Sequence, residues 1–205
     1  MKTRLNVHNF AVNKGVMGEA DIKGVWDNDL PGIRLQADIE EKNLSSTCVT
    51  GYVSPKLKAL DLRIEADRTN LDLLTPYFEG IFSDLNARAN GLVRLHGGFK
   101  TLDFEGGVRV NLDTKVDILN THLQLHDDSV YIRHGEFALK NARLFDREGN
   151  SGRVSGALRH KHLKNLTYHF DIHGDNLLMY DTNDPGDMMF YGKVYGTGDV
   201  TLKGG

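Results

Sequence analysis

The sequence predicts an all-β protein: an elongated, curved antiparallel or mixed sheet that forms a groove, with one short helix. Three observations support this fold class. Apolar and polar residues alternate over long stretches, which is typical of strands with one buried face. The chain has 22 glycines and only 4 prolines, a balance that suits many strands joined by tight turns. A short sequence phrase also recurs along the chain, which indicates repeated hairpins.

The clearest copy of this phrase covers residues 91–112. It consists of a glycine-led strand, a turn at Gly97 and Gly98, and a lysine followed by alternating apolar residues. Glycine supplies the positive φ that a tight hairpin turn needs. The phrase returns over residues 51–66 and 152–172, and a fourth copy begins at Gly192. One hairpin cannot bury its apolar side alone, so we expect the units to stack or to share a sheet.

The N-terminal part of the chain predicts further strands. Residues 4–26 alternate loosely, and residues 27–32 form a turn because Asp, Asn, Pro and Gly each favour one. Residues 33–39 alternate strictly, and residues 47–53 are rich in β-branched side chains, so each predicts a strand. The single cysteine, Cys48, excludes an intrachain disulfide, and we expect an inert, packed thiol.

Residues 70–85 break the alternation. Apolar side chains recur there at spacings of three and four, as on one face of a helix: Leu71, Leu74, Phe78, Phe82 and Leu85. Thr75 and Pro76 fit an N-cap followed by proline in the first turn. We expect a short helix that covers one end of the core, and the alternative is a mobile gate over a groove.

From residue 116 onward, short apolar pairs follow one another at intervals of roughly ten residues, with turn residues between them. The pairs are Val116/Ile118, Leu123/Leu125, Val130/Ile132, Phe137/Leu139 and Ala142/Leu144. Even spacing of this kind predicts a sandwich, a barrel or a solenoid-like curved sheet. Strands do not alternate with helices, which argues against a parallel doubly wound sheet.

Residues that could carry chemistry are sparse, so we expect a protein that is not an enzyme and has no cofactor. His169, Asp171 and His173 share one side of a predicted strand and could hold zinc, but without a fourth ligand a solvated surface is the better interpretation. Residues 181–186 resemble the start of an EF-hand loop, yet proline stands at its fifth position and glycine at its twelfth. We therefore expect no bound metal.

The dominant feature is a long apolar side built from aliphatic residues and phenylalanine. Left uncovered, it would exceed the few hundred Å² of apolar patch that soluble proteins tolerate. Such a groove needs an elongated apolar ligand, and phospholipid acyl chains fit that description. The residues predicted to line the groove are Leu60, Leu62, Ile64, Leu102, Phe104, Val108, Val110, Val116, Ile118, Leu123, Leu125, Val130, Ile132, Phe137, Leu139, Tyr168, Phe170 and Ile172.

Two other functions stay open. One is a closed β-sandwich, a structural or interaction module of the cell envelope whose apolar sides seal each other and whose edge strands pair with another strand or another copy. The other is a carbohydrate-binding or hydrolytic β domain, which would need more outward aromatic residues than the 8% aromatic content provides. The net charge of −3 gives no basic field for nucleic acid.

Two longer stretches carry a resemblance to a known family. Residues 146–163 (DREGNSGRVSGALRHKHL) and 176–205 (NLLMYDTNDPGDMMFYGKVYGTGDVTLKGG) resemble the TamB family in its Bacteroidota form, within the AsmA-like superfamily. The resemblance implies a long taco-shaped sheet with an apolar interior in the periplasm. It also implies lipid transport from the inner to the outer membrane, assembly of outer-membrane proteins, and an outer-membrane barrel of the TamA type as partner. The family offers no catalytic residues to carry over.

The two ends of the chain suggest a longer parent protein. The start, MKTRLNVHNF, has no apolar stretch of a signal peptide, and no run approaches the roughly 20 apolar residues of a membrane span. The chain ends within a copy of the phrase. We therefore expect residues 1–205 to be one segment of a repetitive β-groove domain, cut from a protein whose other parts hold the inner-membrane anchor and the docking region.

Overall fold

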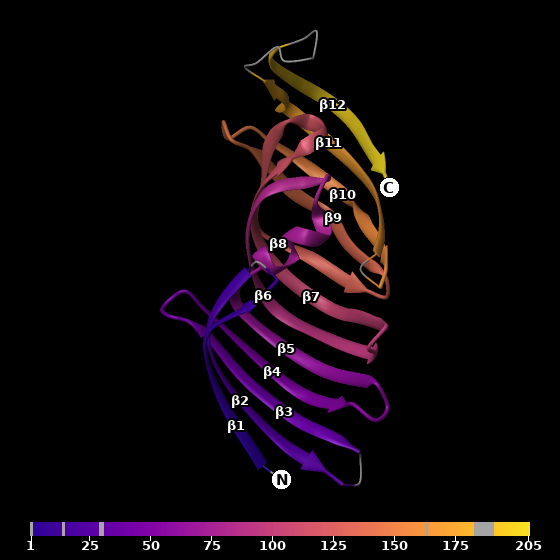
Figure 1. The fold of residues 1–205 in the computed structure, drawn as a ribbon. Helices are drawn as coiled ribbons and strands as arrows, with labels where there is room; N and C mark the ends of the chain where they lie inside the picture. The colour runs from indigo at the N-terminus through magenta and orange to yellow at the C-terminus, as the bar shows by residue number, and fades with distance from the viewer. Residues whose placement is uncertain (1, 14, 29–30, 163, 183–190) are drawn as a thin grey trace.

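The computed structural model describes residues 2–13, 15–28, 31–162, 164–182 and 191–205. These residues form one twelve-stranded sheet in which each strand pairs with its chain neighbours and every pair is antiparallel. The sheet is elongated and curled, and its two edge strands do not meet (Figure 1). The predicted fold class is confirmed, and the pairing is antiparallel throughout rather than mixed.

The strands follow one another in order along the long axis. They are β1 (Lys2–Val12), β2 (Gly15–Asp27), β3 (Gly32–Glu41), β4 (Ser45–Ser54), β5 (Ala59–Asn70), β6 (Phe82–Gly98), β7 (Thr101–Val116), β8 (Thr121–Arg133), β9 (Glu136–Asp146), β10 (Ser151–Lys161), β11 (Lys164–Thr182) and β12 (Gly192–Gly204). Two short 3-10 turns, η1 (Asp72–Leu74) and η2 (Asp117–Leu119), and one helical turn, α1 (Thr75–Phe78), complete the described elements. The turn predicted over residues 27–32 is only partly visible, since Asp29 and Leu30 lie outside the described residues.

The segment between β5 and β6 is less helical than its apolar spacing predicts. Thr75 is the first residue of α1 rather than its N-cap, no side chain caps the helix, and Phe82 already begins β6. The apolar side chains of the segment have another use, because Leu71 packs on one buried cluster of the sheet and Leu73, which lies outside the predicted stripe, packs on another. The segment therefore lies against the core as a cover, and the strand pairing of Phe82 with Val116 ends the helix early.

Six strands bend at β-bulges in which a non-glycine residue adopts the left-handed conformation, with φ between 50° and 54°: Asn9, Arg68, Asp84, Asp127, Asn141 and Asn176. Four of these residues donate their backbone N–H to a polar side chain on the adjoining strand, Arg68 to Asn90, Asp127 to Asn111, Asn141 to Ser155 and Asn176 to Thr197. A bulge bends its strand and increases the local twist. The repeated bulges thus account for much of the curl.

The glycine-led strand of the repeated phrase is wrong for two copies, because Gly51 and Gly91 lie inside β4 and β6, whereas Gly152 and Gly192 lie at the starts of β10 and β12. Gly106 in β7 has φ of +140°, and a Cβ there would lie 2.2 Å from the carbonyl oxygen of Leu92 on β6. Likewise, the hairpin turn after β6 is formed by Phe99 and Lys100, and Gly97 is a strand residue with φ of +114°. The recurring glycines allow neighbouring backbones to approach closely in a strongly bent sheet.

Two adjacent glycines in β7 test this role. Gly106→Ala should lower the free energy of unfolding by about 2 kcal/mol, because the alanine would have both a positive φ and a backbone clash. Gly107→Ala is the matched control, since its Cβ would lie 3.6 Å from the nearest atom outside its chain neighbours and should be neutral or slightly stabilising. Urea denaturation of both variants measures the difference, and equal stability would contradict the assigned role.

Candidate functional site

The inner side of the sheet carries aligned rows of apolar side chains. Strand register places Leu35, Leu62, Leu95 and Phe104 in one row that also includes Gly24 and Gly51. The rows on either side contain Ile33, Val53, Leu60 and Leu102, and Ile64 and Val93. We call these ten residues on β3 to β7 the apolar wall. They share a face because successive strand residues alternate sides and paired residues point the same way.

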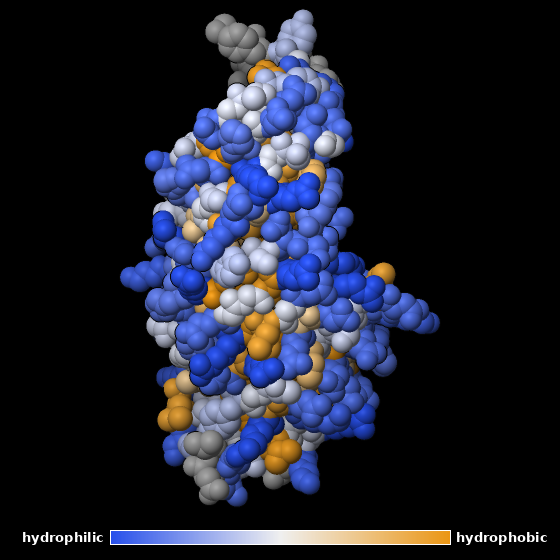
Figure 2. Space-filling view, turned by 180° about the vertical axis from the view of Figure 1, so that it is seen from behind, coloured by the Kyte–Doolittle hydropathy of each residue, from blue (hydrophilic) through white to orange (hydrophobic). Residues whose placement is uncertain are grey.

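The apolar wall is only partly covered by the protein. Each of its residues is half-buried, and none belongs to or packs against either buried cluster. The wall nevertheless lies on the same face as the larger cluster, since Phe104 of the wall and the buried Val110 are separated by an even number of residues on β7. In Figure 2, apolar surface is visible as a broken strip along the long axis, with hydrophilic surface on both sides.

The predicted lining residues divide into three groups. Leu60, Leu62, Ile64, Leu102 and Phe104 belong to the apolar wall. A second group is partly buried further along the same face, with the first four packed against the larger cluster: Val108, Val130, Leu139, Phe170, Phe137 and Tyr168. A third group is buried: Val110, Val116, Leu123, Leu125, Ile132 and Ile172. The structure therefore places much of the predicted lining in the protein's own core.

One residue of the predicted lining is misplaced. Ile118 lies in η2 rather than on a strand, and it is 63% exposed. The chain leaves β7 after Val116 to make the connection to β8, so the alternation stops there. Conversely, the prediction missed Ile33, Leu35, Val53, Val93 and Leu95 of the wall, although their alternation is visible in the sequence.

The C-terminal part of the sheet is filled by the protein itself. Leu177 and Leu178 of β11 are fully buried, and Leu177 joins the larger cluster with Leu123 and Leu144 of β8 and β9. The bulge at Asn176 turns this half of β11 inward. We call Leu177 and Leu178 the plug, because Leu177 fills the inner face over β8 and β9 and the fully buried Leu178 follows it directly.

Asp146, the last residue of β9, holds the plug in place. It is 2% exposed and accepts hydrogen bonds from the backbone N–H of Leu178 at 2.8 Å, from those of Glu148 and Asn150 at 2.9 Å, and from the Asn150 side chain at 2.8 Å. Burial alone would raise the pKa of this carboxyl, but the hydrogen bonds from Asn150, Leu178 and Glu148 outweigh it and lower the pKa below its ordinary value.

Asp146→Asn should therefore lower the free energy of unfolding by about 2 kcal/mol at neutral pH. The new amide group would face two donors, the Leu178 N–H and the Asn150 side chain. A carboxyl with a depressed pKa in the folded state stabilises above its unfolded pKa of about 3.9 and loses that contribution as the pH falls through its folded pKa. The difference between the two proteins should accordingly shrink below about pH 4.

Urea denaturation across this pH range measures the effect, and hydrogen exchange of the Leu178 amide reports on the plug directly. Asp67→Asn is the control, because Asp67 is exposed and its ion pair with Arg68 is long, at 3.8 Å. Equal stabilities of Asp146→Asn and Asp67→Asn at neutral pH would show that Asp146 does not hold the plug.

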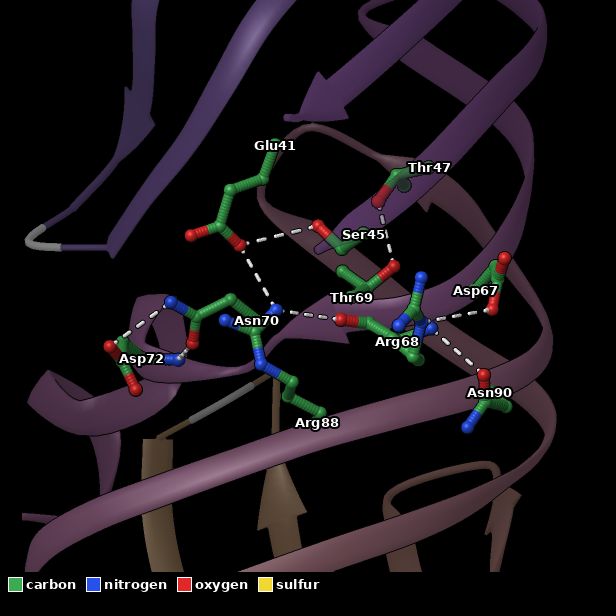
Figure 3. A network of polar contacts seen from close by, with 10 residues as sticks. All are labelled: Glu41, Ser45, Thr47, Asp67, Arg68, Thr69, Asn70, Asp72, Arg88 and Asn90. Atoms are coloured by element: carbon green, nitrogen blue, oxygen red, sulfur yellow. Dashed lines mark hydrogen bonds and ion pairs between the residues drawn. The ribbon is translucent and has the colours of Figure 1, made fainter. Parts of the chain in front are cut away.

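A polar network ties β3 and β4 to β5 and β6 beside the first bulge of β5 (Figure 3). The hydroxyls of Thr47 and Thr69 are 2.7 Å apart and buried. Arg88 donates to the Glu41 carboxylate at 3.0 Å and to the backbone carbonyl of Arg68 at 3.1 Å. These charges are held in pairs across strands, so the network fixes the bend rather than presenting reactive groups.

The candidate metal ligands are not brought together in a site. His169 lies 3.5 Å from Asp171, whereas His173 pairs with Asp199 on β12 at 2.8 Å, and no group of three or more His, Cys, Asp or Glu within the described residues could hold a metal ion. In the EF-hand-like stretch, residues 183–186 lie outside the described part of the chain. Cys48 is half-buried, and its burial together with Asp38 raises the pKa of the thiol.

No described helix is long and apolar enough to cross a membrane. Comparison of the chain with protein-family models, with curated proteins and with solved structures finds no match. Any functional proposal therefore depends on the residues and geometry of the sheet itself.

Proposed function

We propose that this sheet is a non-enzymatic groove segment that holds phospholipid acyl chains. The observation that carries the proposal is the apolar wall, which lies on the inner face of the curl, where the described residues form no second layer over it. Its side chains come from five neighbouring strands spaced about 4.8 Å apart, so the wall extends about 20 Å along the sheet. A wall of this shape fits an elongated hydrocarbon ligand.

The energetics of the wall suit transport better than tight storage. Each methylene group removed from water contributes about 0.8 kcal/mol, so an acyl chain on the wall is stabilised substantially. Hydrophobic contacts are non-directional. Most side chains of the wall are Leu, Ile or Val, so neighbouring strands offer a bound chain similar contacts. A bound chain can therefore slide along the sheet without breaking specific contacts.

The resemblance to the TamB family supports a cellular setting for this activity. In that setting the segment belongs to a periplasmic protein that supports lipid transport from the inner to the outer membrane and assembly of outer-membrane proteins. The inner-membrane anchor and the docking surface for a TamA-type barrel would belong to other parts of the parent protein.

A second candidate, a structural or interaction module of the envelope, has one observation in its favour. β1 and β12 are the edges of the sheet and have no strand on their outer sides within the described residues, so each could pair with a further strand or with another copy. The two-sheet sandwich imagined for this function is not formed, because all twelve strands belong to one sheet.

A double substitution on the wall tests the lipid proposal. Leu62→Glu with Phe104→Glu places two carboxylates in one row of the wall, which should remove most of the phospholipid that co-purifies with the protein, as measured by native mass spectrometry. Both side chains are half-buried, so the fold should survive. Val110→Arg should instead unfold the protein, because it buries an unpaired charge in the larger cluster.

Tyr131→Glu is the matched control for the wall variant. Tyr131 is an exposed aromatic residue on β8, and its ring faces Lys140 on the polar side of the sheet. Its substitution should leave bound phospholipid unchanged. A wild-type protein with no bound lipid, or a wall variant that keeps as much lipid as the control, would count against the groove.

A further inference from the structure

The two rims of the sheet carry opposite charges. In an antiparallel meander, alternate turns lie on the same side, so the turns after β2, β4, β6, β8 and β10 line one margin, on the right in Figure 1. The turn after β2 has no Lys or Arg, and the other four turns are basic. The basic residues at these turns are Lys56, Lys58, Lys100, Arg133, Lys161 and Lys164, which we call the basic rim. Residues 55–58, 99–100, 133–135 and 161–164 contain no Asp or Glu.

The opposite rim is predominantly acidic. Its turns and adjoining strand ends carry the acids Glu41, Asp72, Glu79, Asp117, Asp146, Glu148 and Asp181, against the described basic residues Lys42, Lys115, Arg147 and Lys193. The acids near the basic rim are neutralised locally: Glu136 pairs with Arg159 at 2.9 Å, and Asp27 pairs with Arg34 at 2.7 Å. The asymmetry therefore extends over the margin from the turn after β4 to the turn after β10 and is not visible in the net charge of −3.

The cations of the basic rim are exposed, and among the described residues none of the six forms an ion pair. They differ in this from arginines on the outer face of the sheet, such as Arg94, which is held by Asp61 at 2.7 Å. Lysine and arginine side chains that are solvated and unpaired remain available to an anionic ligand.

The basic rim adjoins the apolar wall. Lys58 stands two residues before Leu60, and Lys100 stands two residues before Leu102, so each cation lies in the turn that leads directly into a strand of the wall. The same turns expose two large apolar side chains, Leu57 at 62% and Phe99 at 44%. Positive charge and uncovered hydrocarbon surface thus lie side by side over β4 to β7.

We infer that the basic rim binds the phosphate of an anionic phospholipid whose acyl chains lie on the apolar wall. This inference rests on the proposed function and adds a headgroup preference to it. Ammonium groups form charge-assisted hydrogen bonds with phosphate oxygens. Lys56 and Lys58 lie in the turn after β4, and Lys100 lies in the turn after β6, which is the next turn along the same margin. A zwitterionic headgroup brings its own cation to the same place, so the basic rim favours a headgroup with net negative charge. The preference depends on ionic strength, because exposed charges are screened by salt.

The test compares two soluble lipids with identical short chains, dihexanoyl-phosphatidylglycerol and dihexanoyl-phosphatidylcholine. Native mass spectrometry measures their binding to the intact chain, and emission of Trp26, the one tryptophan, gives a second signal because Trp26 pairs with Ile33 of the wall. At low salt the phosphatidylglycerol should bind about fivefold more tightly, and high salt should remove the difference.

A triple variant, Lys56→Gln/Lys58→Gln/Lys100→Gln, should lose this preference and still bind phosphatidylcholine as the wild type does. The matched control is Lys42→Gln/Lys115→Gln/Arg153→Gln, which removes the same charge from positions away from the basic rim and should keep the preference. Thermal unfolding of both variants verifies the fold.

The outcomes separate the headgroup inference from the groove. Equal binding of the two lipids to the wild type would overturn the basic rim as a headgroup site and leave the groove intact. Binding of neither lipid would overturn both. Inorganic phosphate alone forms a further arm: if it binds with the same dependence on the rim lysines while the two lipids bind equally, the rim is a site for free phosphate and the lipid inference fails.

Discussion

Every strand of this protein has one apolar side, and the described chain provides no second sheet to cover it. The sheet must therefore bury that side by curling on itself, and the left-handed bulges and the close-packed glycines make the curl sterically accessible. Arg68 shows how the strain of a bulge is offset, because its backbone N–H is received by Asn90 of the next strand. The core, the plug and the apolar wall are all consequences of how far the curl proceeds at each point along the sheet.

The curl is complete at one part of the sheet and incomplete at another. Over β8 to β11 the inner face closes around Leu123, Leu144 and Leu177, whereas over β3 to β7 the wall stays half-covered. Asp146 accounts for this difference. Its buried carboxylate accepts hydrogen bonds from Leu178 of β11 and from Asn150 in the turn after β9, and these bonds fix β11 across β9. A ligand on the wall would therefore meet the plug as it moves toward the C-terminal strands, and passage beyond it would require the plug to open.

The sequence was sufficient to predict the fold class, most strand positions and the apolar face, because alternation is a local property. Predicting where the groove ends would have required knowledge of contacts between segments far apart in the sequence. Val110 and Phe104 follow the same alternation on β7, yet one is in a closed cluster and the other on the wall. That difference depends on whether a distant segment, such as Leu177, folds over the site. The helix between β5 and β6 was overpredicted for a similar reason, since Leu71 and Phe82 of its apolar stripe pack against the larger cluster from backbone that is not helical. The separation of charge between the two rims could not be predicted from the sequence, because it depends on which turns share a margin of the sheet.

The strict order of the strands also bears on how the molecule assembles. Each strand finds its partner in the next stretch of chain, so most native pairings join segments close in sequence, which lowers the entropic cost of loop closure. Hairpins can be added one at a time as the polypeptide emerges from the ribosome or a translocation pore, and each new hairpin has a template in the preceding one. The growing edge can accept a further strand at every stage, which makes protection of that edge a requirement during biosynthesis.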